Sequence, residues 1–275
     1  MAGRAFRFGV VAAPQGGAKQ WRDLAVRAEE QGFSTLLTPD NLHFAAPTVS
    51  LAIAASVTTS LRVGTFVLAS PLRTPRAAAW DAHSLSSMTE GRFELGLGTG
   101  LPVMKDQAAE LGLSYESAGG RLRQISDTID HVRKLDGDAH TPVMIAAGGP
   151  KARELAGQKA DIAALAGGAF VTRDETAERV AEVRAAAGSR ADDIEFSMNL
   201  FVVGDADMPE WVKGFVGADR ATLVERDSLA LLPGSPQQMV DELQRRRDAF
   251  GTSYVTVNSV FMDDLAPVVA QLTGK

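Results

Sequence analysis

Residues 61–98, "LRVGTFVLASPLRTPRAAAWDAHSLSSMTEGRFELGLG", contain a complete strand–helix–strand unit. The apolar, β-branched run over 61–69 predicts one strand, and "RFELGLG" over 92–98 predicts another, with a helix between them. Successive strands joined through a helix lie parallel, with a right-handed crossover. The segment therefore predicts an α/β fold, and the number of such units along the chain decides which one.

The same alternation of strands and helices continues on both sides of this unit. Further strands are predicted at 6–12, 34–39, 142–147, 161–166, 194–203 and 253–258, which gives eight in all. Trp21, Ala25 and Ala28 lie on one face of the first helix, which is expected to end at Gly32. Eight strand–helix units in about 250 residues is what a (β/α)₈ barrel requires. We therefore expect a single TIM-barrel domain over residues 1–275.

The structural competitor is a doubly wound open sheet. Its dinucleotide-binding version places a Gly-x-Gly-x-x-Gly turn directly after the first strand. Here that turn reads "APQGGAKQ" (13–20), which does not match. Such sheets also have fewer strands than the eight predicted for this chain. The barrel is the better prediction.

Composition narrows the classes of partner. The chain has 28 Lys plus Arg against 34 Asp plus Glu, a net charge of -6 without any basic run, which argues against nucleic acid and anionic membranes. It has no cysteine, which excludes disulfides, thiolate metal sites and a cysteine nucleophile. His131 and His140 have no second metal ligand near them in sequence, so no metal site is predicted. The apolar part of the N-terminus is too short for a signal peptide, and no stretch approaches the ~20 apolar residues of a membrane span. We expect a cytoplasmic protein that acts on a small molecule.

Two connections, 99–120 and 204–234, are longer than a barrel needs. They follow the fourth and seventh strands, and so leave the carboxyl ends, where barrels bind ligands. Met104, Trp211 and Phe215 give these insertions apolar side chains. Such side chains either cover a flat ligand or pack the insertion on the barrel, and the sequence leaves both readings open.

Polar residues follow the second strand abruptly. In "LLTPDNLHF" (36–44), Asp40, Asn41 and His43 come directly after a run suited to the core. They either hold a turn together or face a pocket. At a barrel's carboxyl end they are candidate catalytic residues, although an amide donates and accepts hydrogen bonds without transferring a proton near neutral pH.

Strand-to-helix turns differ in whether their own side chains accept hydrogen bonds from the first N–H groups of the helix that follows. A helix start exposes unpaired N–H groups and partial positive charge. Before the helix at "GSPQQMV" (234–240), Ser235 and Gln238 form a capping box that supplies the acceptors. That helix start is predicted to be closed to ligands.

The turn "IAAGGPKAREL" (145–155) has no such side chain. Gly148 and Gly149 precede Pro150 at the first helical position, and Lys151 adds positive charge. This pattern predicts an anion or phosphate site, or else a tight turn capped by water. Gly167–Gly168 repeats the feature at the next strand end, and two neighbouring glycine turns together would seat one extended phosphate-bearing ligand.

The order of motifs resembles one family. "VGTFVLASPLRTPRAAAWDAHSLSSMTEGRFELGLGTG" (63–100) is similar to the luciferase-like flavin and deazaflavin oxidoreductases, which share Pro-Leu-Arg-x-Pro, a helix, and Gly-Arg-Phe-x-Leu-Gly-Leu-Gly-x-Gly. "GGPKARELAGQKADIAAL" (148–165) and "GSPQQMVDELQRRRDAFGTSYVTV" (234–257) resemble later parts of that family. The series covers most of the chain and is most similar to the actinobacterial branch that uses coenzyme F420.

The resemblance implies where a cofactor lies. The family fold is a (β/α)₈ barrel whose deazaflavin or flavin ring rests against a bulge in the third strand, often with a non-prolyl cis peptide. The bulge falls at Phe66 and Val67, and Thr99 and Gly100 would border the ring. Gly148, Gly149, Gly167 and Gly168, with Pro150 and Lys151 beside them, would receive the phosphate-bearing tail.

Three positions depart from the family pattern. Asp40 matches a family Asp, but Asn41 stands where many members have a His. His43, two residues on, either replaces that His or holds the turn. Leu101 occupies the place of a Glu in the sugar-phosphate dehydrogenases, and "AGGAF" (166–170) lacks a Lys that some relatives have. These differences argue against a sugar dehydrogenase.

The resemblance implies an F420-dependent oxidoreductase that transfers hydride between the deazaflavin C5 and an electron-poor C=C or C=N bond of a small organic substrate. One alternative is an FMN-dependent monooxygenase supplied by a separate flavin reductase. Another is a barrel that binds a cofactor or ligand without turnover, which the departures at Asn41 and Leu101 motivate. A homodimer is an expected assembly, since dimers are common among the proteins that the chain resembles.

Overall fold

A computed structural model describes residues 4–275, so the first three residues of the predicted domain 1–275 lie outside it. Eight strand positions form one parallel sheet in the order β3-β2-β1-β11-β8-β7-β6-β5, and β3 also pairs with β5, which closes the sheet into a cylinder. The strands are β1 (Arg7–Val11), β2 (Thr35–Thr38), β3 (Arg62–Thr65), β5 (Phe93–Gly98), β6 (Val143–Ala146), β7 (Ile162–Ala164), β8 (Glu195–Leu200) and β11 (Thr252–Asn258). The predicted (β/α)₈ barrel is confirmed.

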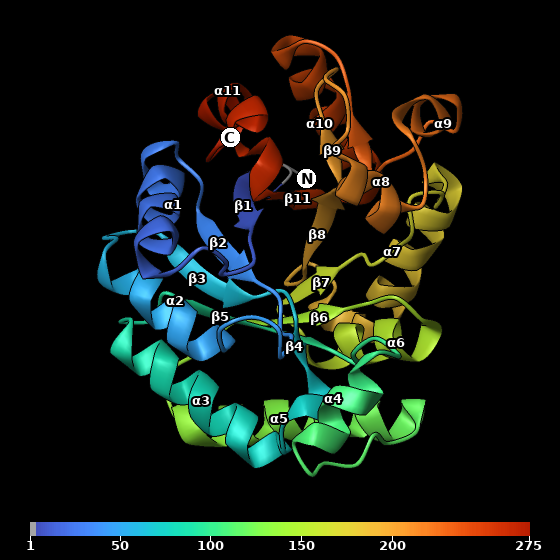
Figure 1. Cartoon of the computed structure of the whole chain (residues 1–275). Coiled ribbons are helices and arrows are strands. Elements are labelled where there is room, and N and C mark those ends of the chain that lie inside the picture. The colour runs from blue at the N-terminus through green and yellow to red at the C-terminus, as the bar shows by residue number, and fades with distance from the viewer. Residues whose placement is uncertain (1–3) are drawn as a thin grey trace.

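Helices surround the cylinder (Figure 1). The outer ring consists of α1 (Ala18–Glu30), α2 (Pro47–Ser56), α3 (Pro75–Met88), α5 (Ala118–Asp136), α6 (Pro150–Lys159), α7 (Arg173–Ala187), α10 (Pro236–Phe250) and α11 (Met262–Leu272). The capping box of Ser235 and Gln238 is present at the start of α10. Between residues 4 and 275, no helix is both long and apolar enough to cross a bilayer.

Two predicted strands are interrupted. The run 61–69 divides into β3 and β4 (Leu68–Ala69), and 194–203 divides into β8 and β9 (Val202–Val203). β9 pairs with β10 (Leu231–Leu232), a strand that the sequence analysis missed, in a separate two-stranded sheet. The insertions carry α4 (Met104–Glu110) after β5, and α8 (Glu210–Val216) and α9 (Arg220–Glu225) after β9.

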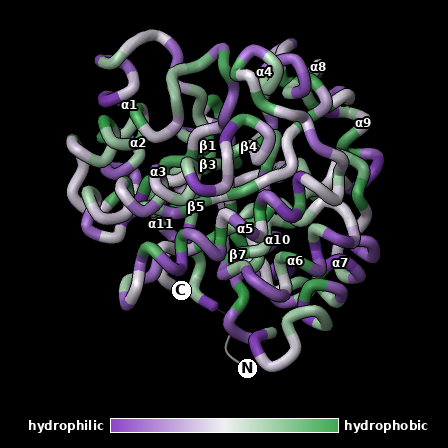
Figure 2. Tube along the Cα trace, turned by 90° about the horizontal axis from the view of Figure 1, so that it is seen from below, coloured by the Kyte–Doolittle hydropathy of each residue, from purple (hydrophilic) through white to green (hydrophobic). Residues whose placement is uncertain are grey.

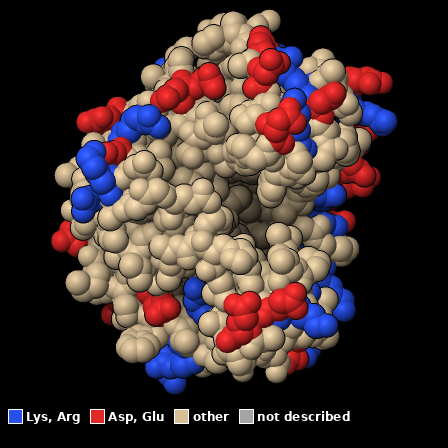
Figure 3. All heavy atoms as spheres, in the orientation of Figure 1, with Lys and Arg blue, Asp and Glu red and all other residues tan. Residues whose placement is uncertain are grey.

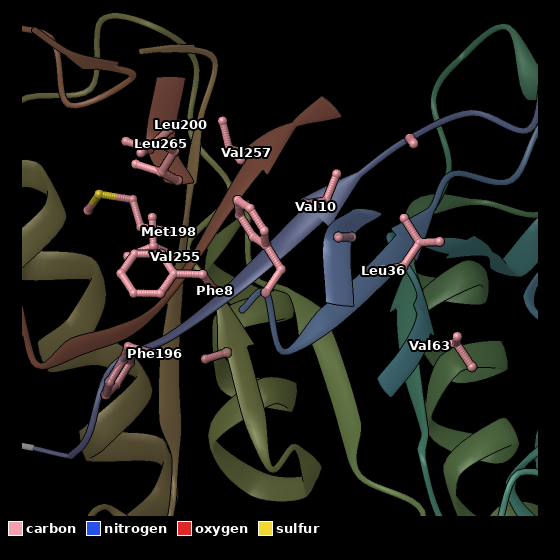
Figure 4. Packing of buried hydrophobic residues seen from close by; sticks show 14 of the residues in the cluster. Phe8, Val10, Leu36, Val63, Phe196, Met198, Leu200, Val255, Val257 and Leu265 are labelled. Carbon is pink, nitrogen blue, oxygen red and sulfur yellow. The ribbon is translucent and has the colours of Figure 1, made fainter. Parts of the chain in front are cut away.

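Side chains alternate between two apolar layers. On β1, Phe8 and Val10 point outward and pack beside Val255 and Val257 of β11, in the layer that the helices cover (Figure 4). The cylinder itself is filled by a second cluster from β2, β6, β7 and β11, namely Leu37, Met144, Ile162, Ala164 and Tyr254. The inner cluster closes the middle of the barrel and leaves only its two ends accessible.

Charged residues line a shallow hollow of about 410 Å³ at the amino end. Arg7 pairs with Glu94 (2.7 Å) and Glu195 (2.6 Å), and its guanidinium lies 3.6 Å from the ring centroid of Tyr254. Arg62 also pairs with Glu94 (2.6 Å). Burial raises the pKa of the Tyr254 hydroxyl, so this side chain stays neutral. These ion pairs join β1, β3, β5 and β8 at the amino end. Barrels of this fold bind their ligands at the opposite, carboxyl end.

Glu29, near the end of α1, ties that helix to the loop before β3. Its Oε1 accepts hydrogen bonds from the amides of Thr59 (2.9 Å), Ser60 (2.6 Å) and Leu61 (2.8 Å). Burial alone would raise the pKa of this carboxyl, but the amide hydrogen bonds lower it to about 2. A carboxyl with a lowered pKa stabilises the fold above its unfolded pKa, and this contribution is lost as the pH falls through the folded value.

We therefore expect Glu29→Gln to lower the free energy of unfolding by about 1–3 kcal/mol at neutral pH, because an amide accepts these bonds without charge. The difference from the parent protein should shrink as the pH falls from about 4.5 towards about 2, where Glu29 is protonated in both states. Urea denaturation at a series of pH values measures it. Glu30→Gln, an exposed neighbour on α1, is the matched control and should change stability by less than about 0.5 kcal/mol. A difference that is the same at every pH would contradict the assignment.

Candidate functional site

The carboxyl end of the barrel is hollowed. Figure 3 shows the face presented in Figure 1, with a depression at its centre surrounded mainly by uncharged atoms. Figure 2, turned by 90°, places α4 and α8 at one end of the molecule and both termini at the other. The insertions after β5 and β9 therefore stand around the hollow, as expected of segments that leave carboxyl ends.

A bulge interrupts the third barrel strand beside this hollow. Gly64 pairs with Glu94 and Leu68 with Leu97, so the third strand has one more residue than β5 between the two pairs. The peptide bond between Phe66 and Val67 is cis, at the place that the family resemblance implied. Phe66 packs against the cluster inside the barrel.

The side chain of Thr65 replaces the missing ladder at this bulge. Its Oγ1 donates a hydrogen bond to the carbonyl of Gly96 (2.7 Å) and accepts one from the amide of Gly96 (2.9 Å). Thr65 is fully buried, so these two bonds satisfy backbone groups that no water reaches.

Glycines on β5 make room for the bulge. A Cβ at Gly96 would lie 2.0 Å from the carbonyl oxygen of Thr65, and a Cβ at Gly98 would lie 2.4 Å from Cγ2 of Val67. The motif Gly-Leu-Gly in "FELGLG" is therefore a packing requirement of the neighbouring strand. As a result, Val67 lies across Gly98 at the rim of the barrel.

The turn after β5 is held from two sides. Gly100 has φ +75, and a Cβ there would lie 2.9 Å from Sδ of Met104 and 3.0 Å from Cγ of Pro71. The carbonyl of Thr99 accepts a hydrogen bond from Nε of Arg121 on α5 (2.8 Å). Thr99 and Gly100 thus lie on a fixed backbone at the end of the strand that borders Val67.

The apolar residues of the two insertions have different environments. Met104 is buried with Ala69 and Leu72, which supports the packing interpretation for this residue. Trp211 is 55% exposed and Phe215 is 69% exposed, although the Phe215 ring lies 5.6 Å from that of Phe201. The second insertion therefore presents large apolar side chains to solvent at the carboxyl end.

The two glycine turns lie next to each other. A Cβ at Gly148 would meet only Ala166, at 3.7 Å, which belongs to the turn that continues to Gly167 and Gly168. Gly149 is the N-cap of α6 without a capping side chain, Pro150 takes the first helical position, and Lys151 is exposed beside it. The predicted neighbourhood of the two turns is confirmed, and backbone N–H groups at the start of α6 are left open.

Two arginines that the sequence analysis did not select hold these turns. Arg153 is buried and donates from Nη1 to the carbonyl of Gly148 (2.6 Å) and from Nε to Glu182 (2.6 Å), and this hydrogen bond lowers the pKa of the Glu182 carboxyl. Arg179 donates from Nη1 to the carbonyl of Ala166 (3.0 Å). Arg179 also lines a small pocket between the ends of β7 and β8, with Gly167, Gly168 and Asn199.

Asp40 is part of the wall. It is 3% exposed, and its carboxylate accepts hydrogen bonds from both terminal nitrogens of Arg73 and from the amide of Ala69 (3.0 Å). The pair joins the end of β2 to the Pro-Leu-Arg-x-Pro turn. Both oxygens are occupied, so Asp40 is placed to fix the rim.

Asn41 lies at the same rim and is held by α4. Its Oδ1 accepts hydrogen bonds from the amide of His43 (2.9 Å) and from Nε2 of Gln107 (3.1 Å). Gln107 is 4% exposed, and its Oε1 accepts from the amide of Leu42 (3.3 Å). The imidazole of His43 is exposed and has no hydrogen-bond partner within the described part of the chain. Sequence reasoning missed Gln107, since its partners lie more than sixty positions away.

The site has small side chains at its floor. At one edge lie the uncapped backbone N–H groups at the start of α6, and at another lie the side-chain carboxamides of Asn41 and Gln107. Gly98 lies against Val67, with Ala146 beside it, whereas Asn199 and Thr256 of the neighbouring strands β8 and β11 form a hydrogen bond (2.9 Å) with each other. Within residues 4–275, no group of three His, Asp or Glu side chains is placed to hold a metal ion.

Curated relatives include two kinds of enzyme. An F420-dependent glucose-6-phosphate dehydrogenase of Nakamurella multipartita is 28% identical over 235 residues, which is 73% of this chain and 68% of that protein. A 5,10-methylenetetrahydromethanopterin reductase of Methanolobus tindarius is 27% identical over 175 residues, 56% of this chain. The match spans about half of that reductase, 52% of its length.

The fold also matches solved structures. An F420-dependent secondary alcohol dehydrogenase in complex with an F420–acetone adduct superposes with a TM-score of 0.76 at 17% sequence identity, covering 98% of this chain and 99% of that one. At this identity the match establishes the fold alone. The family model of the luciferase-like monooxygenases matches residues 5–252, nearly the whole barrel. The chain belongs to the luciferase-like monooxygenase family.

Proposed function

We propose that this protein is an F420-dependent oxidoreductase that transfers hydride between the deazaflavin C5 and an electron-poor double bond of a small organic substrate. The observation that carries the proposal is the placement of the Phe66–Val67 bulge and two adjacent glycine turns on one rim of the barrel. Similar curated proteins are named as F420-dependent enzymes, which supports this cofactor over FMN. When bound, reduced F420 would supply the hydride, and water would supply the proton.

The residues present fit such a cofactor. For the ring, Val67 offers an apolar contact, with the backbone of Thr99 and Gly100 alongside. For the anionic tail, the uncapped start of α6 at Gly149 offers N–H groups, and a Cβ there would have open space around it. Exposed backbone at a helix N-terminus favours phosphate, and a nearby cation adds to the attraction. We assign that contribution to Lys151.

The substrate is proposed to differ from that of the sugar-phosphate dehydrogenases. Leu101, at the position where the family resemblance implies a Glu in those enzymes, is 61% exposed at the rim. Asp40, the buried carboxylate that follows β2, accepts hydrogen bonds from both terminal nitrogens of Arg73. A site without a free acid or base at these positions is suited to reducing a polarised double bond rather than oxidising an alcohol.

The family name also supports a second candidate, an FMN-dependent monooxygenase that receives reduced flavin from a separate reductase. Cofactor titration by calorimetry, with F420 and FMN side by side, distinguishes the two. We expect F420 to bind at least about tenfold more tightly, a difference of about 1.4 kcal/mol. Tighter binding of FMN together with oxygen consumption would favour the monooxygenase.

Turnover assays address the third candidate, a binding protein without catalysis. With reduced F420 and a panel of enones and imines, we expect oxidation of the cofactor that depends on the organic substrate. Tight cofactor binding without any hydride transfer across the panel would support the binding protein instead. The same preparation gives the assembly state by sedimentation, for which we propose a homodimer of single-domain chains.

A further inference from the structure

Hydrogen bonds on the rim fix which side of the Asn41 carboxamide is available. Its oxygen accepts from the His43 amide (2.9 Å) and from Nε2 of Gln107 (3.1 Å), which uses both acceptor positions. The carboxamide nitrogen has no partner among residues 4–275. The part of the Asn41 carboxamide that is left for a ligand is therefore a donor.

Gln107 sets this orientation. It is buried on α4, donates to Asn41, and accepts from the amide of Leu42 through its other end. Its own carboxamide is consequently fixed as well: were it turned over, its nitrogen would face the Leu42 N–H and its oxygen would face the Asn41 oxygen. Both pairs would be repulsive, so a single arrangement is satisfied.

Exposed apolar side chains flank Asn41 and Gln107. Leu42 is 38% exposed beside Asn41, and Leu101 (61%) and Val103 (56%) lie in the segment that leads into α4. No charged side chain lies within the tripeptide 101–103, and the charge of Arg73 is matched by Asp40. A ligand at this edge would meet the donor of Asn41 beside apolar side chains, with the exposed imidazole of His43 as a second polar group.

We propose that Asn41 selects substrates by donating a hydrogen bond to a carbonyl oxygen, and that Gln107 is the residue that positions it. The inference rests on the proposed function and narrows it: the substrate is an uncharged α,β-unsaturated carbonyl compound. A hydrogen bond at the carbonyl oxygen withdraws electron density from the conjugated C=C bond and stabilises negative charge on that oxygen. The nitrogen of an imine would in addition need a proton, which the Asn41 carboxamide does not supply near neutral pH, so the contact favours the carbonyl compound.

Binding measurements test the inference without turnover. The probes are cyclohex-2-enone and the hydrocarbon 3-methylcyclohexene, titrated into protein loaded with oxidised F420. The parent protein should prefer the enone, and the infrared carbonyl stretch of bound enone should shift to lower frequency. In Asn41→Asp the carboxylate still accepts from His43 and Gln107 but offers no donor. We expect the preference for enone to fall at least about tenfold and the frequency shift to disappear.

Gln107 variants separate positioning from folding. Gln107→Leu should lose most of the preference for enone, whereas affinity for 3-methylcyclohexene should change less than about twofold. Gln107→Glu keeps the acceptor for the Leu42 amide but sets a buried carboxylate oxygen against Oδ1 of Asn41. It should therefore resemble Gln107→Leu in its loss of enone preference and in its affinity for 3-methylcyclohexene, and should have a lower thermal stability than the parent. Enone preference retained in Asn41→Asp, or lost in Gln107→Leu together with hydrocarbon binding, would overturn the inference.

Affinity for F420 in the same samples keeps the two proposals apart. If the parent protein fails to bind F420, the proposed function fails. If it binds F420 but does not distinguish the enone from the hydrocarbon, only the role of Asn41 fails.

Discussion

A Gly148→Val variant is expected to bind F420 at least about 100-fold more weakly than the parent protein, a loss of about 2.8 kcal/mol. The physical reason is that the valine side chain would cover backbone at the start of α6, where the phosphate-bearing tail is proposed to lie. The fold itself tolerates the change, because a Cβ at Gly148 meets only Ala166, at 3.7 Å. The free energy of unfolding should therefore change by less than about 1 kcal/mol. Calorimetric titration and urea denaturation measure the two quantities.

Substitutions at two other glycines serve as comparisons for Gly148→Val. Gly149→Ala adds one methyl group into open space at the helix cap and should weaken F420 binding less than the valine does. Gly96→Ala places a Cβ 2.0 Å from the Thr65 carbonyl and should destabilise the whole barrel. Equal losses of binding and stability in Gly148→Val would show that this turn is structural only, and would remove the main support for the phosphate site.

Asp40→Ala is expected to lower the free energy of unfolding by about 3–5 kcal/mol, the usual cost of removing one partner of a buried ion pair. The carboxylate is almost fully buried, so its loss leaves the Arg73 guanidinium and the Ala69 amide without their acceptor. The double variant Asp40→Leu/Arg73→Met should recover a large part of the loss, because it leaves no charge unpaired. Urea denaturation of the parent protein and the two variants gives the comparison.

An exposed pair provides the control for this prediction. Lys19 and Asp23 are 2.6 Å apart on the solvent side of α1, with side chains 83% and 60% exposed. Asp23→Ala should cost no more than about 1 kcal/mol. If Asp40→Ala were equally mild but abolished turnover, then Asp40 would have a chemical role that its hydrogen bonds do not indicate.

Much of the barrel follows from local patterns in the sequence. Short β-branched runs separated by amphipathic helices predict parallel strands, and this rule placed all eight barrel positions. The interruption of 61–69 does not follow from the pattern, because Phe66 and Val67 are ordinary strand residues by type. What breaks the strand is space provided by Gly96 and Gly98 on its neighbour, about thirty residues later. β10 was missed because two residues carry no periodicity.

The site was predictable where one turn carries the signal. Gly148 and Gly149 before Pro150 are visible in sequence as a helix start without a cap, and the structure has that uncapped start. The partners of the candidate polar residues were harder, because each comes from a distant element. Arg73 is 33 positions from Asp40, and Gln107 is 66 positions from Asn41. Composition and spacing do not indicate such long-range pairs. The orientation of the Asn41 carboxamide therefore does not follow from the sequence and is seen only in the folded chain.

The hydroxyl of Thr65 divides the joint between the third barrel strand and β5 into two ladders. Main-chain pairing joins Gly64 to Glu94 and resumes between Leu68 and Leu97, and between these pairs one side chain binds both polar backbone groups of Gly96. The bulge at 66 and 67 is thus held on both sides, so its path can vary without a change of register before or after it. These two residues are therefore where the wall beside the proposed ligand can be adjusted without disturbing the neighbouring pairs.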